Sequence, residues 1–233
     1  MLIRAVALLV ALAAVVESAP AQRTQRVTLR ADDGANIVAT WYEPPSRPTP
    51  AVILVHTLTR SRREWDAAAS RLASDGIAAL AIDLRGHGES SGDASNLAAM
   101  LNDVKAAKRH LAVRADVIHS RIGVVGTSIG ANLAALAAAD EPGIASLILL
   151  SPSLDYRGLR IEAALKKYGN RPVLLVAGTD DGYGMRTVKD LAKAGGGPRE
   201  VLLLDNAGHG ITMLTKAPDL GRQIVDWFHR TLQ

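Results

Sequence analysis

Short apolar runs alternate with amphipathic stretches along most of this chain, and this alternation constrains the fold more than any other feature. The apolar runs are bounded by Gly, Pro, Asp or Ser, and several are continuous, as expected for strands buried on both faces of a parallel sheet. They cover Ala51–His56, Ile77–Asp83, Arg121–Thr127, Ser146–Leu150, Pro172–Ala177 and Glu200–Leu204. Between them, helical patterns cover Arg63–Ala73, Asn96–Val113, Ile129–Ala139, Leu159–Tyr168, Met185–Ala194 and Leu220–Leu232.

Alternating strands and helices predict a doubly wound α/β fold with right-handed crossovers. Ahead of them, Thr24–Arg30 and Asn36–Tyr42 flank an Asp-Gly turn, which predicts an antiparallel hairpin at one edge of the sheet. We therefore expect one α/β domain over residues 22–233, with a mostly parallel sheet of about eight strands. The interval 151–171 has room for a loop and one helix, so no large lid is expected.

Residues 1–21 have the pattern of a secretory signal peptide. Arg4 precedes the apolar run Ala5–Val16, and Ala19-Pro20-Ala21 places small residues at a cleavage site after Ala21. The run is shorter than the roughly 20 residues that span a bilayer, which favours cleavage over the alternative of an uncleaved anchor. We expect a mature protein that is periplasmic or secreted and has no stable membrane span.

The composition excludes several classes of function. The net charge is only +4, aromatic residues make up 3%, and no basic stripe is present, so nucleic-acid binding is not expected. The absence of Cys excludes disulfides, thiolate metal ligands and a cysteine nucleophile. No phosphate-binding or dinucleotide-binding glycine motif occurs, and the His residues lack the spacing of metal ligands. We expect neither a cofactor nor a metal ion, and the sequence leaves the oligomeric state open.

The most informative motif is Gly126-Thr127-Ser128-Ile129-Gly130, which lies between a predicted strand and a predicted helix. A Gly-x-Ser-x-Gly sequence in this context predicts a nucleophile elbow, a sharp turn that projects the Ser hydroxyl from the carboxyl edge of the sheet. The N–H of Ile129, at the start of the helix, would then point toward a developing oxyanion.

A Ser nucleophile needs a base and a carboxylate, and both follow in chain order. Asp180 and Asp181 come directly after a strand, and His209 lies between glycines in the loop after the last strand. His56 ends a strand and is expected to line the site without acting as the base. Further candidates for the substrate pocket are Tyr156, Tyr183 and Met213.

Taken together, these motifs resemble the α/β-hydrolase superfamily, in particular small bacterial serine hydrolases of the dienelactone-hydrolase-like or serine-aminopeptidase-like type. The elements that carry the resemblance appear in family order: His56-Thr57-Leu58, Asp83–Ser90, the elbow at Ser128, Gly178–Asp181 and Gly208-His209-Gly210. The resemblance implies that Ser128 is the nucleophile, His209 the base and Asp181 the orienting carboxylate. Spacing alone leaves Asp180 as an alternative to Asp181.

This chain departs from the family pattern in two ways. Thr57 stands where the family commonly has Gly, although the N–H of Leu58 still occupies the position of the second oxyanion donor beside that of Ile129. A β-branched residue restricts this turn, so the oxyanion hole is expected to be shaped differently. Dienelactone hydrolases use a Cys nucleophile that this chain lacks, which disfavours that specific reaction.

The resulting hypothesis is a serine hydrolase that cleaves carboxylic esters of small molecules through an acyl-enzyme. One alternative is an amide or peptide hydrolase of the serine aminopeptidase type. Another, from a different class, is a non-catalytic binding protein with an α/β-hydrolase fold.

Overall fold

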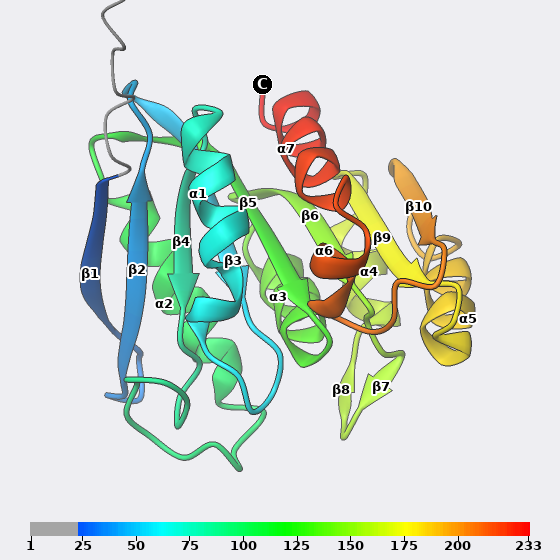
Figure 1. Ribbon diagram of the computed structural model, residues 1–233. Helices are drawn as coiled ribbons and strands as arrows, with labels where there is room; N and C mark the ends of the chain where they lie inside the picture. Colours follow the sequence, from blue (N-terminus) through cyan, green and yellow to red (C-terminus); the bar gives the residue numbers. More distant parts are fainter. Residues whose placement is uncertain (1–22) are drawn as a thin grey trace, which may run out of the picture.

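The computed structural model describes residues 23–233, and the expected signal peptide and its cleavage site therefore lie outside the described residues (Figure 1). No helix within this range is both long and apolar enough to cross a bilayer.

An eight-stranded sheet forms the centre of the protein, with the strand order β1-β2-β4-β3-β5-β6-β9-β10. The strands are β1 (Arg23–Arg30), β2 (Asn36–Glu43), β3 (Thr49–Val55), β4 (Ala78–Ile82), β5 (Val117–Thr127), β6 (Ile144–Leu150), β9 (Val173–Gly178) and β10 (Arg199–Leu204). The first two form the predicted antiparallel hairpin at one edge, and β2 also pairs antiparallel with β4. The pairs from β4 to β10 are all parallel, which confirms the predicted fold class.

Helices cover both faces of the sheet. They are α1 (Asp66–Ser74, preceded by the 3-10 turn η1, Arg62–Trp65), α2 (Met100–Ala112), α3 (Ile129–Asp140), α4 (Glu162–Tyr168), α5 (Gly182–Leu191), α6 (Thr212–Lys216) and α7 (Leu220–Thr231). Figure 1 shows α1, α6 and α7 in front of the sheet, with α2, α3 and α4 behind it. The buried residues of α5 belong to the same core cluster as those of α2, α3 and α4.

Burial explains why the strands were recognisable in the sequence. Residues 51–55 of β3 and the whole of β4 are fully buried, because helices cover both faces of the central strands. Helix α3 is apolar on nearly all sides, since it packs against β5 and β6 and also against α2 and α4. The helix that begins directly after Ser128 is therefore packed on nearly all sides.

Loops that follow the parallel strands meet at one end of the molecule, the lower end in Figure 1, opposite the C-terminus. This edge is where ligands bind in open α/β folds. The carboxyl ends of β3, β5, β6, β9 and β10 are followed there by His56, Ser128, Ser151, Asp181 and His209 respectively.

Two small elements were not predicted. A hairpin of β7 (Asp155–Tyr156) and β8 (Leu159–Arg160) lies at the same lower end, and the short helix α6 follows the loop that carries His209 (Figure 1). Helix α4 consequently begins at Glu162, because Leu159–Arg160 pair with the other strand of the hairpin. Between β6 and β9 the chain carries only this hairpin and α4, so no large lid is inserted there, as predicted.

The hairpin is held by hydrogen bonds to Asn132, a fully buried residue of α3. Its side-chain amide donates to the carbonyls of Ser153 (2.9 Å) and Leu159 (2.8 Å) and accepts the N–H of Ser153 (3.0 Å). Both ends of the hairpin are thus fixed to the helix that begins at the elbow.

Candidate active site

Ser128 occupies a strained turn between β5 and α3. Its backbone lies at φ 52° and ψ −118°, a region that costs a non-glycine residue about 1–3 kcal/mol. The flanking glycines permit the turn: a Cβ on Gly126 would lie 2.2 Å from the carbonyl oxygen of Gly130, and one on Gly130 would lie 2.4 Å from that of Val55. The turn therefore has the geometry of the predicted nucleophile elbow.

His209 and Asp181 are brought together from loops that follow β10 and β9. The ring Nδ1 of His209 lies 2.6 Å from Oδ2 of Asp181. Since an ionised carboxylate only accepts hydrogen bonds, Nδ1 carries the proton and Nε2 is left as an acceptor. The other carboxylate oxygen of Asp181 accepts the N–H of Gly184 (2.9 Å), so Asp181 also caps helix α5.

The neighbouring carboxylate, Asp180, has a different partner. Its Oδ1 accepts the N–H of Gly208 at 2.7 Å, which holds the backbone of the loop rather than the ring of His209. The geometry therefore pairs Asp181 with the ring, and Asp180 with the residue just before it.

Ser151 links the loop of His209 to the elbow, a role that no sequence motif indicated. It is fully buried, has a positive φ of 49°, and its hydroxyl accepts the N–H of Gly210 at 2.9 Å. The preceding residue, Leu150, accepts the N–H of Ser128 at 2.9 Å. The end of β6 therefore holds both the elbow and the residue after His209.

No hydrogen bond joins the Ser128 hydroxyl to His209 within residues 23–233. The side chain of His209 is 52% exposed, whereas that of Asp181 is 14% exposed. The ring of His209 is thus half-exposed beside a largely shielded carboxylate, and catalytic hydrogen bonds are often longer before substrate binds than after it.

The N–H groups of Leu58 and Ile129 donate to none of the described residues. For Ile129 this is usual, because it is the first residue of α3. The direction of the Leu58 N–H is set by the other end of its peptide unit. The carbonyl of Thr57 accepts from Nδ1 of His56 (2.7 Å) and from the N–H of Arg60 (3.3 Å). Because a trans peptide is planar, this fixed carbonyl makes the Leu58 N–H point the opposite way.

His56 itself is fully buried, and both of its ring nitrogens are occupied. Nε2 accepts the N–H of Leu84 at 2.9 Å, which places the proton on Nδ1. Burial lowers the pKa of His56 to about 4, so the ring is neutral at physiological pH. His56 was expected to line the site, but its ring is fully buried and neither ring nitrogen is free; Nδ1 holds the carbonyl of Thr57 instead.

The other expected pocket residues differ in their exposure to solvent. Met213 on α6 is fully buried, so in this conformation its side chain cannot reach a substrate, contrary to expectation. Tyr156 is half-buried in the hairpin, and Tyr183 is 47% exposed, two residues beyond Asp181. These two tyrosines stay available at the edge of the site.

Glu64 is a residue that the sequence analysis missed, because it lies within a stretch recognised only as helical. Its Oε1 accepts the N–H of Thr57 (2.8 Å) and the hydroxyl of Thr127 (2.9 Å). The second oxygen, Oε2, is buried and has no partner in the structure. Burial raises the pKa of Glu64 to about 7, against the opposing influence of these hydrogen bonds and of Arg60.

A cavity of about 490 Å³ lies next to this carboxyl group, between α1 and the segment 211–221 that follows His209. Glu64, Arg60 and Arg71 line one side, and Ile211 and Thr212 line the other. Its volume falls within the range of small-molecule sites.

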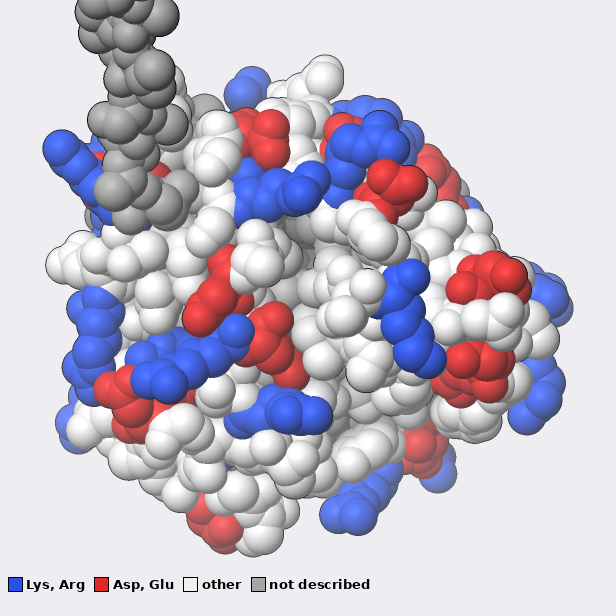
Figure 2. Space-filling view, in the orientation of Figure 1, with Lys and Arg blue, Asp and Glu red and all other residues white. Residues whose placement is uncertain are grey.

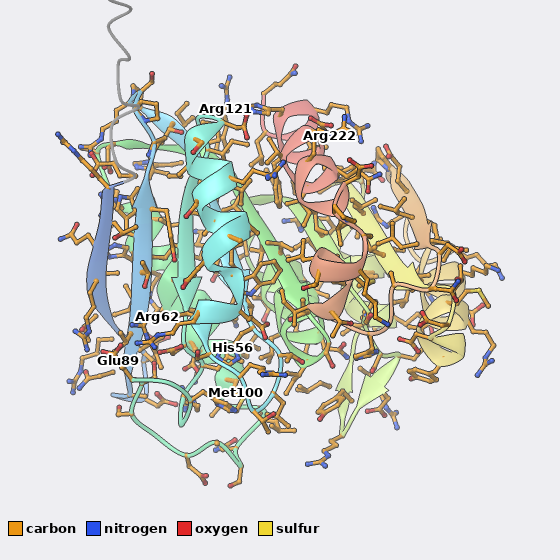
Figure 3. The ribbon with its side chains drawn as sticks, viewed as in Figure 1. His56, Arg62, Glu89, Met100, Arg121 and Arg222 are labelled. Carbon is orange, nitrogen blue, oxygen red and sulfur yellow. The ribbon has the colours of Figure 1, made fainter. Side chains whose placement is uncertain are left out.

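Buried ion pairs fix the loop after β4, below the oxyanion loop. The carboxylate of Asp83 is fully buried and accepts from the Arg62 guanidinium, which also pairs with Glu89. Figure 3 shows Arg62 and Glu89 next to each other at the same lower end as His56. Arg85 forms a second cluster with buried Asp103 (2.6 Å) and with Asp33 (2.5 Å). This loop is scaffold for the site.

Charges on the face that carries α1 and α7 are mixed in sign, with Lys and Arg next to Asp and Glu (Figure 2). Within residues 23–233 no group of three or more His, Asp or Glu side chains is arranged to hold a metal ion.

Comparison with known proteins identifies the family and the fold of the chain. A family model described as serine aminopeptidase, S33, matches residues 46–170, which include Leu58 and Ser128 but end before Asp181 and His209. The uncharacterized protein YfhR of Salmonella typhimurium is 30% identical over 151 residues, which are 58% of this chain and 51% of the relative. The match thus spans about half the length of that curated relative.

Solved structures share the fold at low sequence identity. Dienelactone hydrolase from Anabaena variabilis superposes with a TM-score of 0.78 at 19% identity, covering 91% of this chain and 99% of that one. The esterase Pf2001 from Pyrococcus furiosus superposes with a TM-score of 0.76 at 19% identity, covering 91% and 92%. A hypothetical protein from Pseudomonas aeruginosa gives 0.79 at 16% identity, covering 92% and 95%.

Proposed function

Because the chain belongs to the serine aminopeptidase S33 family of α/β hydrolases, we propose that it is a serine hydrolase that cleaves carboxylic esters through an acyl-enzyme. One observation carries the proposal: Ser128 is held in a strained elbow at the same sheet edge as the His209–Asp181 pair, whose nitrogen and oxygen lie 2.6 Å apart. An activated hydroxyl is the chemistry for which such an arrangement is suited.

In the first half-reaction, the Ser128 hydroxyl attacks the ester carbonyl and its proton passes to Nε2 of His209. The negative charge that develops on the carbonyl oxygen is held by the N–H groups of Leu58 and Ile129. His209 then donates the proton to the leaving alcohol, and the C–O bond of the ester breaks. The acyl group stays on Ser128.

In the second half-reaction, Nε2 of His209 removes a proton from water, which attacks the acyl-enzyme. The same two N–H groups hold the second oxyanion, and the acid leaves as Ser128 regains its proton. Asp181 orients the ring throughout and stabilises its cationic form. The bond from Gly184 to Asp181 keeps the carboxylate in place.

The substrate that this site favours is a small ester that needs no lid to enclose it. Tyr156, which is half-buried, and Tyr183, which is 47% exposed, would border the open site. The signal-peptide pattern of residues 1–21 supports a periplasmic or secreted location, where soluble esters are accessible.

The test is hydrolysis of a panel of p-nitrophenyl esters by the purified protein and by Ser128→Ala. Turnover by the wild type and a loss of at least 10³-fold in the variant are expected. Ser120→Ala is a matched control, since Ser120 is exposed on the same strand, β5, remote from the elbow. Equal turnover by wild type and Ser128→Ala would exclude Ser128 as the nucleophile.

Amide hydrolysis is the second candidate, and the family description favours it. The same acyl-enzyme would form from an aminoacyl amide, with His209 protonating the leaving amine. Aminoacyl p-nitroanilides assayed beside the esters separate the two reactions. A folded protein that cleaves neither class would instead support the non-catalytic binding role.

A further inference from the structure

The residue in question is Glu64, whose carboxyl group lies between the two segments that supply the oxyanion donors. Thr57 directly precedes Leu58, and Thr127 lies two residues before Ile129. One oxygen of Glu64 accepts from both, from the Thr57 N–H at 2.8 Å and from the Thr127 hydroxyl at 2.9 Å. The spacing between the loop and the elbow is thereby fixed by a single atom.

The Thr57 contact acts on the backbone directly before the Leu58 donor. The bond to the Thr57 N–H fixes the plane of the peptide between His56 and Thr57. The carbonyl of Thr57 is fixed in turn by the ring of His56, at 2.7 Å. Two successive peptide planes are thus held, by Glu64 and by His56, and the second of them contains the Leu58 N–H.

On the elbow side, Thr127 is fully buried, and its hydroxyl donates to Glu64 rather than to a neighbour in the strand. Glycine at position 57 would leave the loop free to settle by its own turn geometry, whereas threonine restricts it. The hydrogen bond from the Thr57 N–H to Glu64 therefore fixes the loop from outside, where a threonine limits the conformations of the turn itself.

Burial raises the pKa of Glu64 to about 7, because a carboxylate is less well solvated at this place than in water. Oε1 is able to accept both hydrogen bonds whether or not Oε2 is protonated.

We propose that Glu64 is a positioning residue that holds the Leu58 and Ile129 N–H groups at the separation an oxyanion requires, by joining the Thr57 N–H and the Thr127 hydroxyl. This inference rests on the proposed serine hydrolase function and adds a residue to its machinery. Glu64 touches no reacting atom and acts through the loop and the elbow. Its loss therefore weakens binding of the transition state more than binding of the ground state.

The test compares Glu64→Ala, which removes both hydrogen bonds, with Glu64→Gln, which keeps an acceptor oxygen. Removing a complete oxyanion donor costs about 10²–10³-fold in kcat. Displacing a donor costs less, so Glu64→Ala should lose about 10–100-fold in kcat with KM changed less than about threefold. Glu64→Gln should retain kcat within about threefold of the wild type, measured with the same p-nitrophenyl ester.

A second pair of variants keeps the test valid if Glu64→Ala does not fold. Thr127→Val removes one of the two hydrogen bonds at nearly constant volume and should lower kcat severalfold, whereas Thr127→Ser should restore it. In a folded Glu64→Ala protein, adding Thr127→Val should cause no further loss, because the shared acceptor is already gone.

Either of two results would overturn the inference in an active wild-type protein. One is a folded Glu64→Ala variant, or Thr127→Val in its place, that keeps full kcat. The other is an equal loss of kcat in Glu64→Gln and Glu64→Ala, which would assign the effect to the charge and not to the shared oxygen. An inactive wild type whose Ser128 fails to react would instead refute the proposed function, so the two failures are distinguishable.

Discussion

Glu64→Gln should have a higher free energy of unfolding, relative to the wild type, at pH 8 than at pH 4.5. The prediction follows from the raised pKa of the Glu64 carboxyl group. Burial raises the pKa of Glu64 from its usual 4.5 to about 7 in the folded protein. Below pH 4.5 the carboxyl is protonated in both folded and unfolded chains. As the pH rises from 4.5 to 7, the unfolded chain releases the proton first, so folding loses stability, and above pH 7 the full cost is present.

The size of the effect follows from the shift. Since one pKa unit corresponds to about 1.4 kcal/mol, the raised pKa of Glu64 costs about 3 kcal/mol of unfolding free energy at pH 8. Gln does not titrate, so the difference in unfolding free energy between Glu64→Gln and wild type should shift in favour of Gln by about 3 kcal/mol between pH 4.5 and pH 8. All other titrations are common to both proteins and cancel.

Urea unfolding followed by circular dichroism at the two pH values measures this difference. Glu162→Gln is the matched control, because Glu162 is 60% exposed on α4 and pairs only with Lys166 on the surface. Its difference from wild type should change by less than about 0.5 kcal/mol between the two pH values. A Glu64→Gln difference that is equally independent of pH would refute the account of a buried, protonated carboxyl.

Four further outcomes follow from the geometry. Gly130→Ala, whose added Cβ would meet the carbonyl oxygen of Val55 at 2.4 Å, should lower the unfolding free energy in urea by about 3 kcal/mol. Asp181→Asn should lower kcat on the order of 10³–10⁴-fold, because the amide no longer holds the ring tautomer, whereas Asp180→Asn keeps an acceptor for the backbone and should stay within about tenfold. Asn132→Ala removes the three bonds that hold the β7–β8 hairpin, so trypsin should cut that hairpin faster than in the wild type, as resolved by mass spectrometry. His56, which is neutral in the folded protein with a pKa of about 4, should make the protein lose about 3 kcal/mol as the pH falls from 6.5 through 4, and His56→Asn should remove this dependence in urea titrations.

The parts of the fold that were predictable are those that leave a local pattern in the sequence, such as a continuous apolar run or a glycine motif. The run at Ala51–His56 is apolar throughout because β3 lies in the middle of the sheet, and the elbow glycines are needed wherever a strand turns sharply into a helix. The β7–β8 hairpin was not predictable, because no local pattern marks it and it is held by Asn132, which lies 21 positions before Ser153 and 27 before Leu159.

The site divides in the same way. Ser128, Asp181 and His209 follow strand ends in a recognisable order, so their placement at one edge was predictable. The choice of Asp181 over Asp180 as the partner of the ring was decided only by where each carboxylate points. Glu64 was missed, because a carboxyl group in an amphipathic helix-like stretch resembles a solvated surface residue, and its contacts to Thr57 and Thr127 exist only in three dimensions.

The most direct test of the central claim is covalent labelling of the purified protein with a fluorophosphonate, read by intact mass and by mapping the modified peptide. The account predicts a single adduct on Ser128, retained in Ser120→Ala and lost in Ser128→Ala. A folded wild-type protein that takes up no label, or an adduct on any other residue, would contradict the claim that this elbow presents an activated serine.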